Sequence, residues 1–227
     1  MYPPPMPAAK KGMSPTGILL LVLGIIVALC VVLVGGCVLM AQNMIGQISP
    51  MIGCMITSEM VDNSIKAYTL DHKGKFPNAA KWEDEIAPYY KRLYEKNAKE
   101  MDEMRKVPMV GGMFETQKPG ETFQCGKGTN ATGFAFNSDL SGVDKATITS
   151  PTRTPLFFEV KEVKRNNALK GDQLPTGAPP KIMNDTRDWI VYYVDGNKNP
   201  FESSGSSSSS DFDFDFDPED ARDPAKK

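Results

Sequence analysis

An uncharged apolar stretch near the N-terminus is the feature that most constrains what this chain can form. Gly17 to Ala41 is a run of 25 residues without a charged side chain. As an α-helix it extends for roughly 37 Å at about 1.5 Å per residue, whereas the hydrocarbon core of a bilayer is about 30 Å thick. A core helix in a soluble domain of this size has a polar face, which this run lacks. The sequence therefore predicts one transmembrane helix within residues 13–41.

The residues on either side of this stretch predict its orientation. Lys10 and Lys11 precede it, and residues 42–49 carry no positive charge. Positive flanks favour the cytoplasmic side, so 1–12 is expected to be a short cytoplasmic leader-like segment and 42–202 an extracytoplasmic domain. A cleaved secretory signal describes this stretch less well, because the apolar region of such a signal is shorter than 25 residues. A lipoprotein signal is also poorer, because Cys37 is followed by apolar residues.

Four cysteines are divided between the predicted span and the predicted domain. Cys30 and Cys37 lie within the span, where a thiol acts as a small apolar residue. Cys54 and Cys125 lie outside it, where oxidation is permitted. Spacing alone does not fix the geometry that a disulfide needs, so the sequence leaves open whether Cys54 and Cys125 pair. None of the cysteine spacings matches a zinc site.

Periodicity predicts two helices followed by a small sheet. Apolar residues recur with helical spacing over 51–71 and 82–106, and Pro88 leaves open a split of the second helix. Beyond residue 107 the helical period ends, and four runs have the composition of strands: 122–125, 133–136, 156–163 and 189–194. This order predicts an α+β fold, in which a long N-terminal helix, transmembrane and then amphipathic, packs on a small antiparallel sheet.

The C-terminal segment 203–227 is rich in serine and in acidic residues. Ser206–Ser210 is an unbroken serine run, and residues 211–217 alternate Asp with Phe. Such a segment lacks the apolar mass for a core of its own, so we expect it to be disordered. The sharper alternative is a sticky or cation-binding tail, although no calcium-loop spacing is present.

The sequence contains no recognisable catalytic constellation, so we do not expect an enzyme. His72 is the one histidine, which is too few for a multi-histidine metal site and leaves one candidate for a His-centred triad. Glycine motifs for phosphate or dinucleotide binding do not occur. Glu83 and Glu85 belong to a charged helix face and are expected to be solvated. The formal net charge is -2, and without a concentrated basic face we do not expect nucleic-acid binding.

The order of these elements resembles that of type IV pilin-like proteins, including the major pseudopilins of type II secretion. The residues that carry the resemblance are Lys10-Lys11-Gly12-Met13, Tyr68-x-x-Asp71-x-x-Gly74-x-Phe76-Pro77, Phe123-Gln124-Cys125, Gly133-Phe134-Ala135-Phe136-Asn137, and Trp189–Val194 followed by Asp195-Gly196. The resemblance implies a pilin-like fold and cleavage between Gly12 and Met13. It also implies a non-enzymatic, single-pass protein of the inner (cytoplasmic) membrane, with a periplasmic or extracellular domain. Its partners would be the membrane and other pilin-like subunits or secretion-machine proteins.

The resemblance also implies a metal ligand set and includes two departures from the family pattern. Major pseudopilins hold calcium in a C-terminal loop, and the matching residues here are Asp195, Asn197 and Asn199, whose oxygens suit that ion. Gly17 stands where pilins carry the Glu used in filament assembly, and Asp185 stands where a signature His is found. Two alternatives remain: a diverged filament subunit, or a single-pass anchored surface binding module that does not polymerise.

Overall fold

The computed structural model describes residues 29–33, 36, 51–106, 117–126, 128–180, 188–198 and 217–222, with the backbone alone for 99–105. The chain divides into two compact units, Met1–Asn43 and Met44–Lys227. In the first unit, residues 29–33 and 36 are helical. Within the described residues, no helix is both long and apolar enough to cross a membrane. The rest of the predicted span 13–41 lies outside the described residues, as do Gly12 and Gly17.

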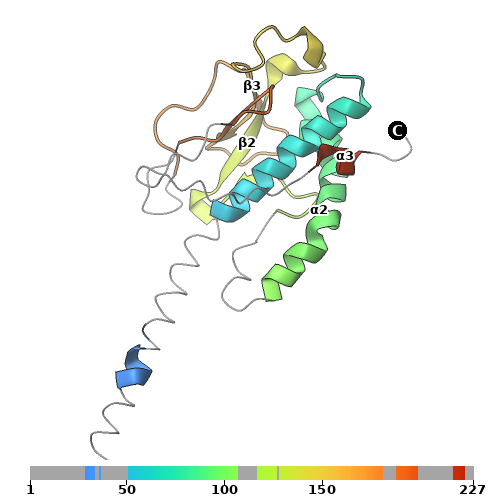
Figure 1. Ribbon diagram of the computed structural model, residues 1–227. Coiled ribbons are helices and arrows are strands. Elements are labelled where there is room, and N and C mark those ends of the chain that lie inside the picture. Colours follow the sequence, from blue (N-terminus) through green and yellow to red (C-terminus); the bar gives the residue numbers. More distant parts are fainter. Residues whose placement is uncertain are drawn as a thin grey trace, which may run out of the picture. The chain divides into compact units, whose positions relative to one another are not determined.

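The amphipathic helix over residues 51–71 supplies one wall of the core of the second unit (Figure 1). Ile56, Met60 and Ile65 are buried in that core, as their spacing predicts. The chain leaves the helix at Gly74, which has a φ of 86° and donates its N–H to the Thr69 carbonyl at 2.9 Å. Glycine adopts this left-handed conformation without steric cost, so it terminates the helix well.

The second helix, α2 (Trp82–Lys106), has the predicted bounds and is continuous through Pro88. The proline removes one backbone N–H from the helix, which alone weakens it. Ile86, Tyr90 and Leu93, on both sides of the proline in sequence, are fully buried in the core. Burial of side chains of this size contributes roughly 1.5–3 kcal/mol each. The packing therefore holds the helix together, and the split that Pro88 left open does not occur.

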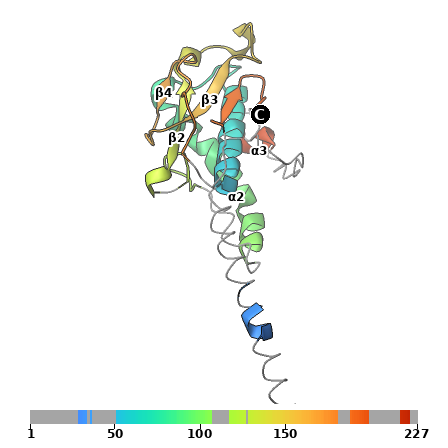
Figure 2. The ribbon, with the colours of Figure 1, turned by 90° about the vertical axis from the view of Figure 1, so that its left-hand side faces the viewer.

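All four regions predicted as strands contain strands of one sheet, part of which is labelled in Figure 2. In spatial order they are β1 (Gln124–Cys125), β2 (Thr132–Asn137), β3 (Pro155–Val160) and β5 (Val191–Tyr193). Neighbours in this series are antiparallel. A further strand, β4 (Ala168–Leu169), pairs in parallel with the end of β2. The fold is thus α+β with a largely antiparallel sheet, and β3 ends at 160 rather than at the predicted 163.

Both faces of the sheet are covered. One face shares the main core with the two long helices, through Phe134, Phe136, Phe157 and Tyr192. The Trp82 ring of α2 lies 5.9 Å from the Phe136 ring and packs against it. The other face carries Phe158, Val160 and Val191, against which Leu169 and Leu174 pack. Alternation along β3 therefore sends Phe157 and Phe158 into different layers, as the period of a strand requires.

The structure describes residues 217–222 of the C-terminal segment 203–227, for which the sequence predicts disorder. These residues contain α3 (Pro218–Ala221), a short helix beside α2. Asp217 accepts a hydrogen bond from the first turn, and proline at the first helical position suits a helix start. Arg222 pairs with Asp71 at 2.9 Å. Ala221 is fully buried. These contacts supply the burial that the acidic composition lacks.

Candidate functional site

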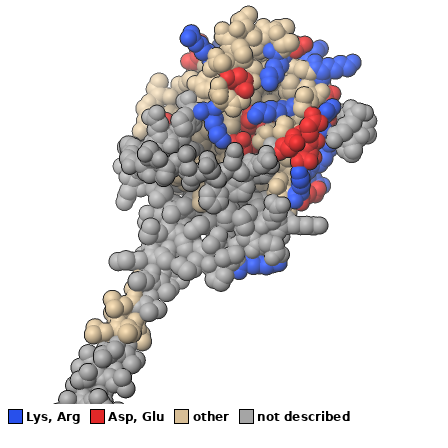
Figure 3. All heavy atoms as spheres, in the orientation of Figure 1, with Lys and Arg blue, Asp and Glu red and all other residues tan. Residues whose placement is uncertain are grey.

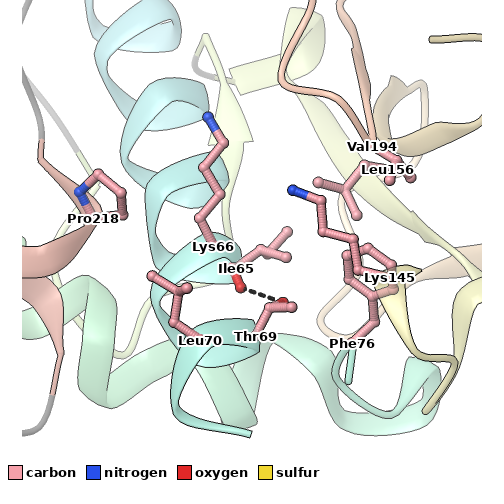
Figure 4. A pocket seen from close by; sticks show the side chains of 9 residues that line it. All are labelled: Ile65, Lys66, Thr69, Leu70, Phe76, Lys145, Leu156, Val194 and Pro218. Carbon is pink, nitrogen blue, oxygen red and sulfur yellow. Dashed lines mark hydrogen bonds between the residues drawn. The ribbon is translucent and has the colours of Figure 1, made fainter. Parts of the chain in front are cut away.

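A cavity of about 230 Å³, named here the Lys66 pocket, opens beside the 51–71 helix (Figure 4). Its walls come from that helix and the turn after it, the short helix η4 (Lys145–Thr147), the start of β3, the residue after β5, and α3. The lining residues are Ile65, Lys66, Thr69, Leu70, Phe76, Lys145, Leu156, Val194 and Pro218. Figure 4 shows the Lys66 and Lys145 side chains extending in the same direction from opposite walls.

Backbone hydrogen bonds fix the wall that carries Lys145. The Lys145 N–H donates to the Gly74 carbonyl at 2.8 Å, and the Phe76 N–H donates to the Val143 carbonyl at 3.0 Å. A Cβ atom at Gly74 would lie 2.9 Å from Asp144 Oδ1, so this approach is too close for any other residue. The glycine that ends the 51–71 helix therefore also sets the position of η4.

The interior of the Lys66 pocket is apolar, and its charged groups are two ammonium ions. The Thr69 hydroxyl donates to the Ile65 carbonyl at 2.7 Å, so its polar atom is already satisfied within the helix. Lys66 Nζ lies 2.6 Å from Asp62 Oδ2. Lys145 Nζ forms no ion pair with any residue that the structure describes. Apolar walls with a few directed charges are typical of ligand sites, and here the charges favour an anionic group next to an apolar one.

The carboxylate that holds Lys66 is itself buried. The Asp62 side chain is 1% exposed, and among the described residues its Oδ1 atom has no hydrogen-bond partner. Burial raises the pKa of Asp62 to about 6, against the opposing effect of the Lys66 ammonium. One turn earlier, Glu59 accepts hydrogen bonds from the Tyr192 hydroxyl at 3.1 Å and from Lys198 Nζ at 2.7 Å. Glu59 therefore ties the helix to β5 and to the turn that follows it.

Glu83, which the sequence placed on a solvated face, is instead buried at the start of α2. Its Oε1 atom accepts from the Asn166 N–H at 3.1 Å, whereas Oε2 forms no hydrogen bond within the described part of the chain. Burial raises the pKa of Glu83 to about 7, opposed by the Asn166 hydrogen bond. Glu85 is only partly buried and pairs with Lys81 at 3.0 Å. No local pattern predicts this difference, because Asn166 lies 83 residues from Glu83.

Asn166 supplies the N-terminal cap that α2 lacks in its own sequence. Its side-chain oxygen accepts from the Glu83 N–H at 2.8 Å and from the Asp84 N–H at 3.3 Å. A cap of this kind satisfies backbone donors that have no partner within the helix. Asn166 has a φ of 52°, a left-handed conformation that asparagine tolerates better than most residues. The segment between β3 and β4 thereby fixes the start of α2.

Cys54 and Cys125 form a disulfide, which settles the pairing that the sequence left open. It joins the 51–71 helix to β1 across a sequence separation of 71 residues. Cys30 in the first unit is free and exposed.

Gly12 and Met13, the predicted processing residues, lie outside the described residues.

Asp195 and Asn197, two of the three residues predicted to bind calcium, lie in the turn that follows β5. Asp195 Oδ1 accepts from the Asn197 N–H at 3.0 Å, and Oδ2 accepts from the Asn197 side-chain amide. Asn199 lies outside the described residues. In the part of the chain that is described, no group of three or more acidic, histidine or cysteine side chains is arranged to hold a metal.

His72 stacks on Tyr68, with ring centroids 3.8 Å apart, and its Nδ1 donates to the Tyr68 carbonyl at 2.8 Å. This places the one histidine in a capping role at the end of the 51–71 helix.

Comparisons with known proteins assign no family. The chain matches no protein-family model, no curated protein and no solved structure. The functional interpretation therefore depends on the sequence pattern and on the geometry described above.

The chemistry of the Lys66 pocket suits an anionic ligand that has an apolar part. Figure 3 shows basic and acidic side chains interspersed over the described part of one face of the second unit. The residues that line the Lys66 pocket include no paired nucleophile and base, which covalent catalysis requires. What they present is an apolar recess flanked by two lysines. Such a recess suits an aromatic or aliphatic group that carries a carboxylate beside it.

Proposed function

We propose that this chain is a membrane-anchored, non-enzymatic pilin-like subunit of a type IV filament or of a type II secretion pseudopilus. One observation carries the proposal: the helix over 51–71, which follows the uncharged stretch Gly17–Ala41, shares its core with an antiparallel sheet. In such a subunit the apolar helix anchors in the inner membrane and packs among the helices of neighbouring copies. The sheet lies outside the cytoplasm, and the subunit contributes to assembly or to protein secretion.

The contacts between helix and sheet support a unit that moves as one body. Ser58 Oγ lies 3.1 Å from the Tyr192 hydroxyl, which also donates to Glu59. The Cys54–Cys125 disulfide joins the same helix to β1 at the other edge of the sheet. Helix and sheet are therefore joined at both edges, as a subunit built around a helical filament core requires.

The disulfide also supports the proposed compartment. Disulfides persist in oxidising environments, such as the periplasm and the cell surface, and are rare in the reducing cytoplasm. A Cys54–Cys125 bond in the second unit is therefore consistent with export of that unit. The paired lysines Lys10 and Lys11 before the apolar stretch give the same orientation.

A second candidate function is a surface binding module on a permanent single-pass anchor. Two observations favour it. Gly17 stands where a filament subunit would carry its assembly Glu, and the Lys66 pocket offers a recess for an anionic group with an apolar neighbour. A module of this kind keeps its leader and does not polymerise.

The mass of the mature protein, purified from membranes of its own host, tests the filament proposal. We expect a chain that begins at Met13 and lacks residues 1–12. A Gly12→Leu variant serves as the matched control and is expected to retain Met1, because a bulky residue at the cleavage point blocks processing. If the wild-type chain in membranes still begins at Met1, processing is refuted and the anchored binding module replaces the filament subunit.

A further inference from the structure

We propose that the Lys66 pocket binds a phenylalanine side chain of the Asp/Phe segment (residues 211–216) of the same chain, with the neighbouring aspartates facing the lysines. The occupant is thus a tethered acidic and aromatic peptide. This inference is independent of whether the chain polymerises, because it concerns a contact within one copy.

The dimensions of the Lys66 pocket suit one aromatic ring. Its volume is about 230 Å³. An apolar cavity of roughly 150 Å³ is large enough to take up benzene, so a phenyl side chain fits without displacing the walls. Phe76 forms part of the lining and provides an aromatic partner. Leu70, which also lines the pocket, leaves 48% of its surface exposed at this site.

The chain itself leads from the pocket into the Asp/Phe segment. Pro218 lines the Lys66 pocket and is the first residue of α3. Phe216 stands two positions before it in the sequence. Two residues of extended chain span at most about 7 Å, so the Phe216 side chain begins within reach of the opening. The contacts of Arg222 with Asp71 hold α3 in place and keep that end of the segment at the pocket.

Charge complementarity selects this segment as the occupant. Residues 211–217 contain four aspartates and no basic residue. The pocket offers Lys66, which already pairs with Asp62, and Lys145, which has no ion pair among the described residues. In an extended chain, successive side chains point in opposite directions. A phenylalanine that enters the apolar recess therefore leaves the aspartates beside it, Asp215 foremost, outside the recess and near the ammonium groups.

Tethering makes such a weak contact effective. A short acidic peptide with one buried ring binds weakly in solution, because it loses conformational freedom on binding. A segment attached at the rim of its own site experiences an effective concentration in the millimolar range for a short flexible linker. The same contact between two separate copies lacks this advantage at ordinary protein concentrations.

Photo-crosslinking in the full chain tests the proposal. A photoreactive benzoyl-phenylalanine replaces Phe216, and the protein is irradiated in nonionic detergent and mapped by mass spectrometry. We expect crosslinks within a single chain to residues of the Lys66 pocket. Crosslinks to the pocket that appear only in dimers overturn the proposal in favour of exchange between copies. Crosslinks confined to other parts of the surface also overturn it.

Two substitutions sharpen the test at exposed positions. Lys145→Glu reverses the charge of a lysine that forms no ion pair with a described residue, and Leu70→Asp places a carboxylate on the exposed wall. We expect each to reduce the yield of pocket crosslinks, by about threefold or more for the charge reversal on the scale of exposed ion pairs. Val163→Asp, another exposed apolar residue that does not line the pocket, is the matched control and should leave the yield unchanged. An unchanged yield in both pocket variants, with unfolding midpoints equal to the wild type, refutes the proposed site.

Discussion

The buried carboxylate of Glu83 makes the stability of the domain depend on pH in a predictable direction. Its Oε2 atom forms no hydrogen bond with any described residue, and burial raises the pKa of Glu83 to about 7 from a usual value of 4.5. In the wild type, the Asn166 N–H donates to Oε1 of Glu83 at 3.1 Å. The Glu83→Gln substitution keeps an oxygen that can accept this hydrogen bond and removes the charge. We therefore expect the variant to be more stable than the wild type at neutral and alkaline pH.

The sign and size of this effect follow from proton linkage. Between pH 4.5 and 7 the native state holds the Glu83 proton more tightly than the unfolded state does, so the free energy of unfolding falls as pH rises through this range. A change from 4.5 to about 7 corresponds to roughly 3 kcal/mol. Below pH 4.5 both states are protonated and the penalty vanishes. Asp62 acts in the same direction between 3.8 and about 6, but it is present in both proteins and cancels in their difference.

Urea unfolding of the full chain in nonionic detergent, followed by tryptophan fluorescence, measures this difference. Trp82 and Trp189 are both buried and report on loss of the core. We expect the two proteins to match near pH 4.5, and the variant to gain up to about 3 kcal/mol by pH 8. The matched control, Glu95→Gln, changes an exposed carboxylate of α2 and should follow the wild type at every pH. A constant difference between Glu83→Gln and the wild type from pH 4.5 to 8 would refute the reasoning.

Two further predictions concern the connections that hold the helices in place. Replacing Cys54 and Cys125 together with serine should lower the free energy of unfolding by about 4 kcal/mol, because the bond closes a loop with a separation of 71 residues; an unchanged urea midpoint under non-reducing conditions would contradict this. Asn166→Gly should lower the free energy of unfolding by about 1 kcal/mol, because the cap of α2 is lost. Asn166→Ala should lower it further, because alanine is strained at a φ of 52°. Equal midpoints for these two variants would show that the backbone conformation at 166 does not matter.

The main elements were predictable because they depend on local periodicity. The spacing of Ile56, Met60 and Ile65 predicts the buried side of the 51–71 helix, and these residues are buried. The four longer runs of strand composition each contain a strand. β4 was not predictable, because two residues within a polar loop carry no periodic signal and become a strand only by pairing with β2.

The remaining features depend on contacts between distant parts of the sequence. The burial of Glu83 depends on Asn166, and the Lys66 pocket combines walls from segments as far apart as Ile65 and Pro218. α3 did have a local signal, since Asp217 followed by Pro218 and acidic residues is typical of a helix start. The acidic composition of the tail nevertheless favours disorder. Two contacts join α3 to the rest of the domain: Arg222 pairs with Asp71, and the Ala221 carbonyl accepts from Arg92.

Photo-crosslinking within native membranes tests the proposed assembly most directly. A photoreactive residue replaces Val32, which lies in the apolar helical segment of the first unit and is 70% exposed. If copies pack helix to helix in a filament, irradiation gives a ladder of dimers, trimers and larger products of this chain. Products that contain a single copy, whether alone or joined to a different protein, contradict a filament subunit.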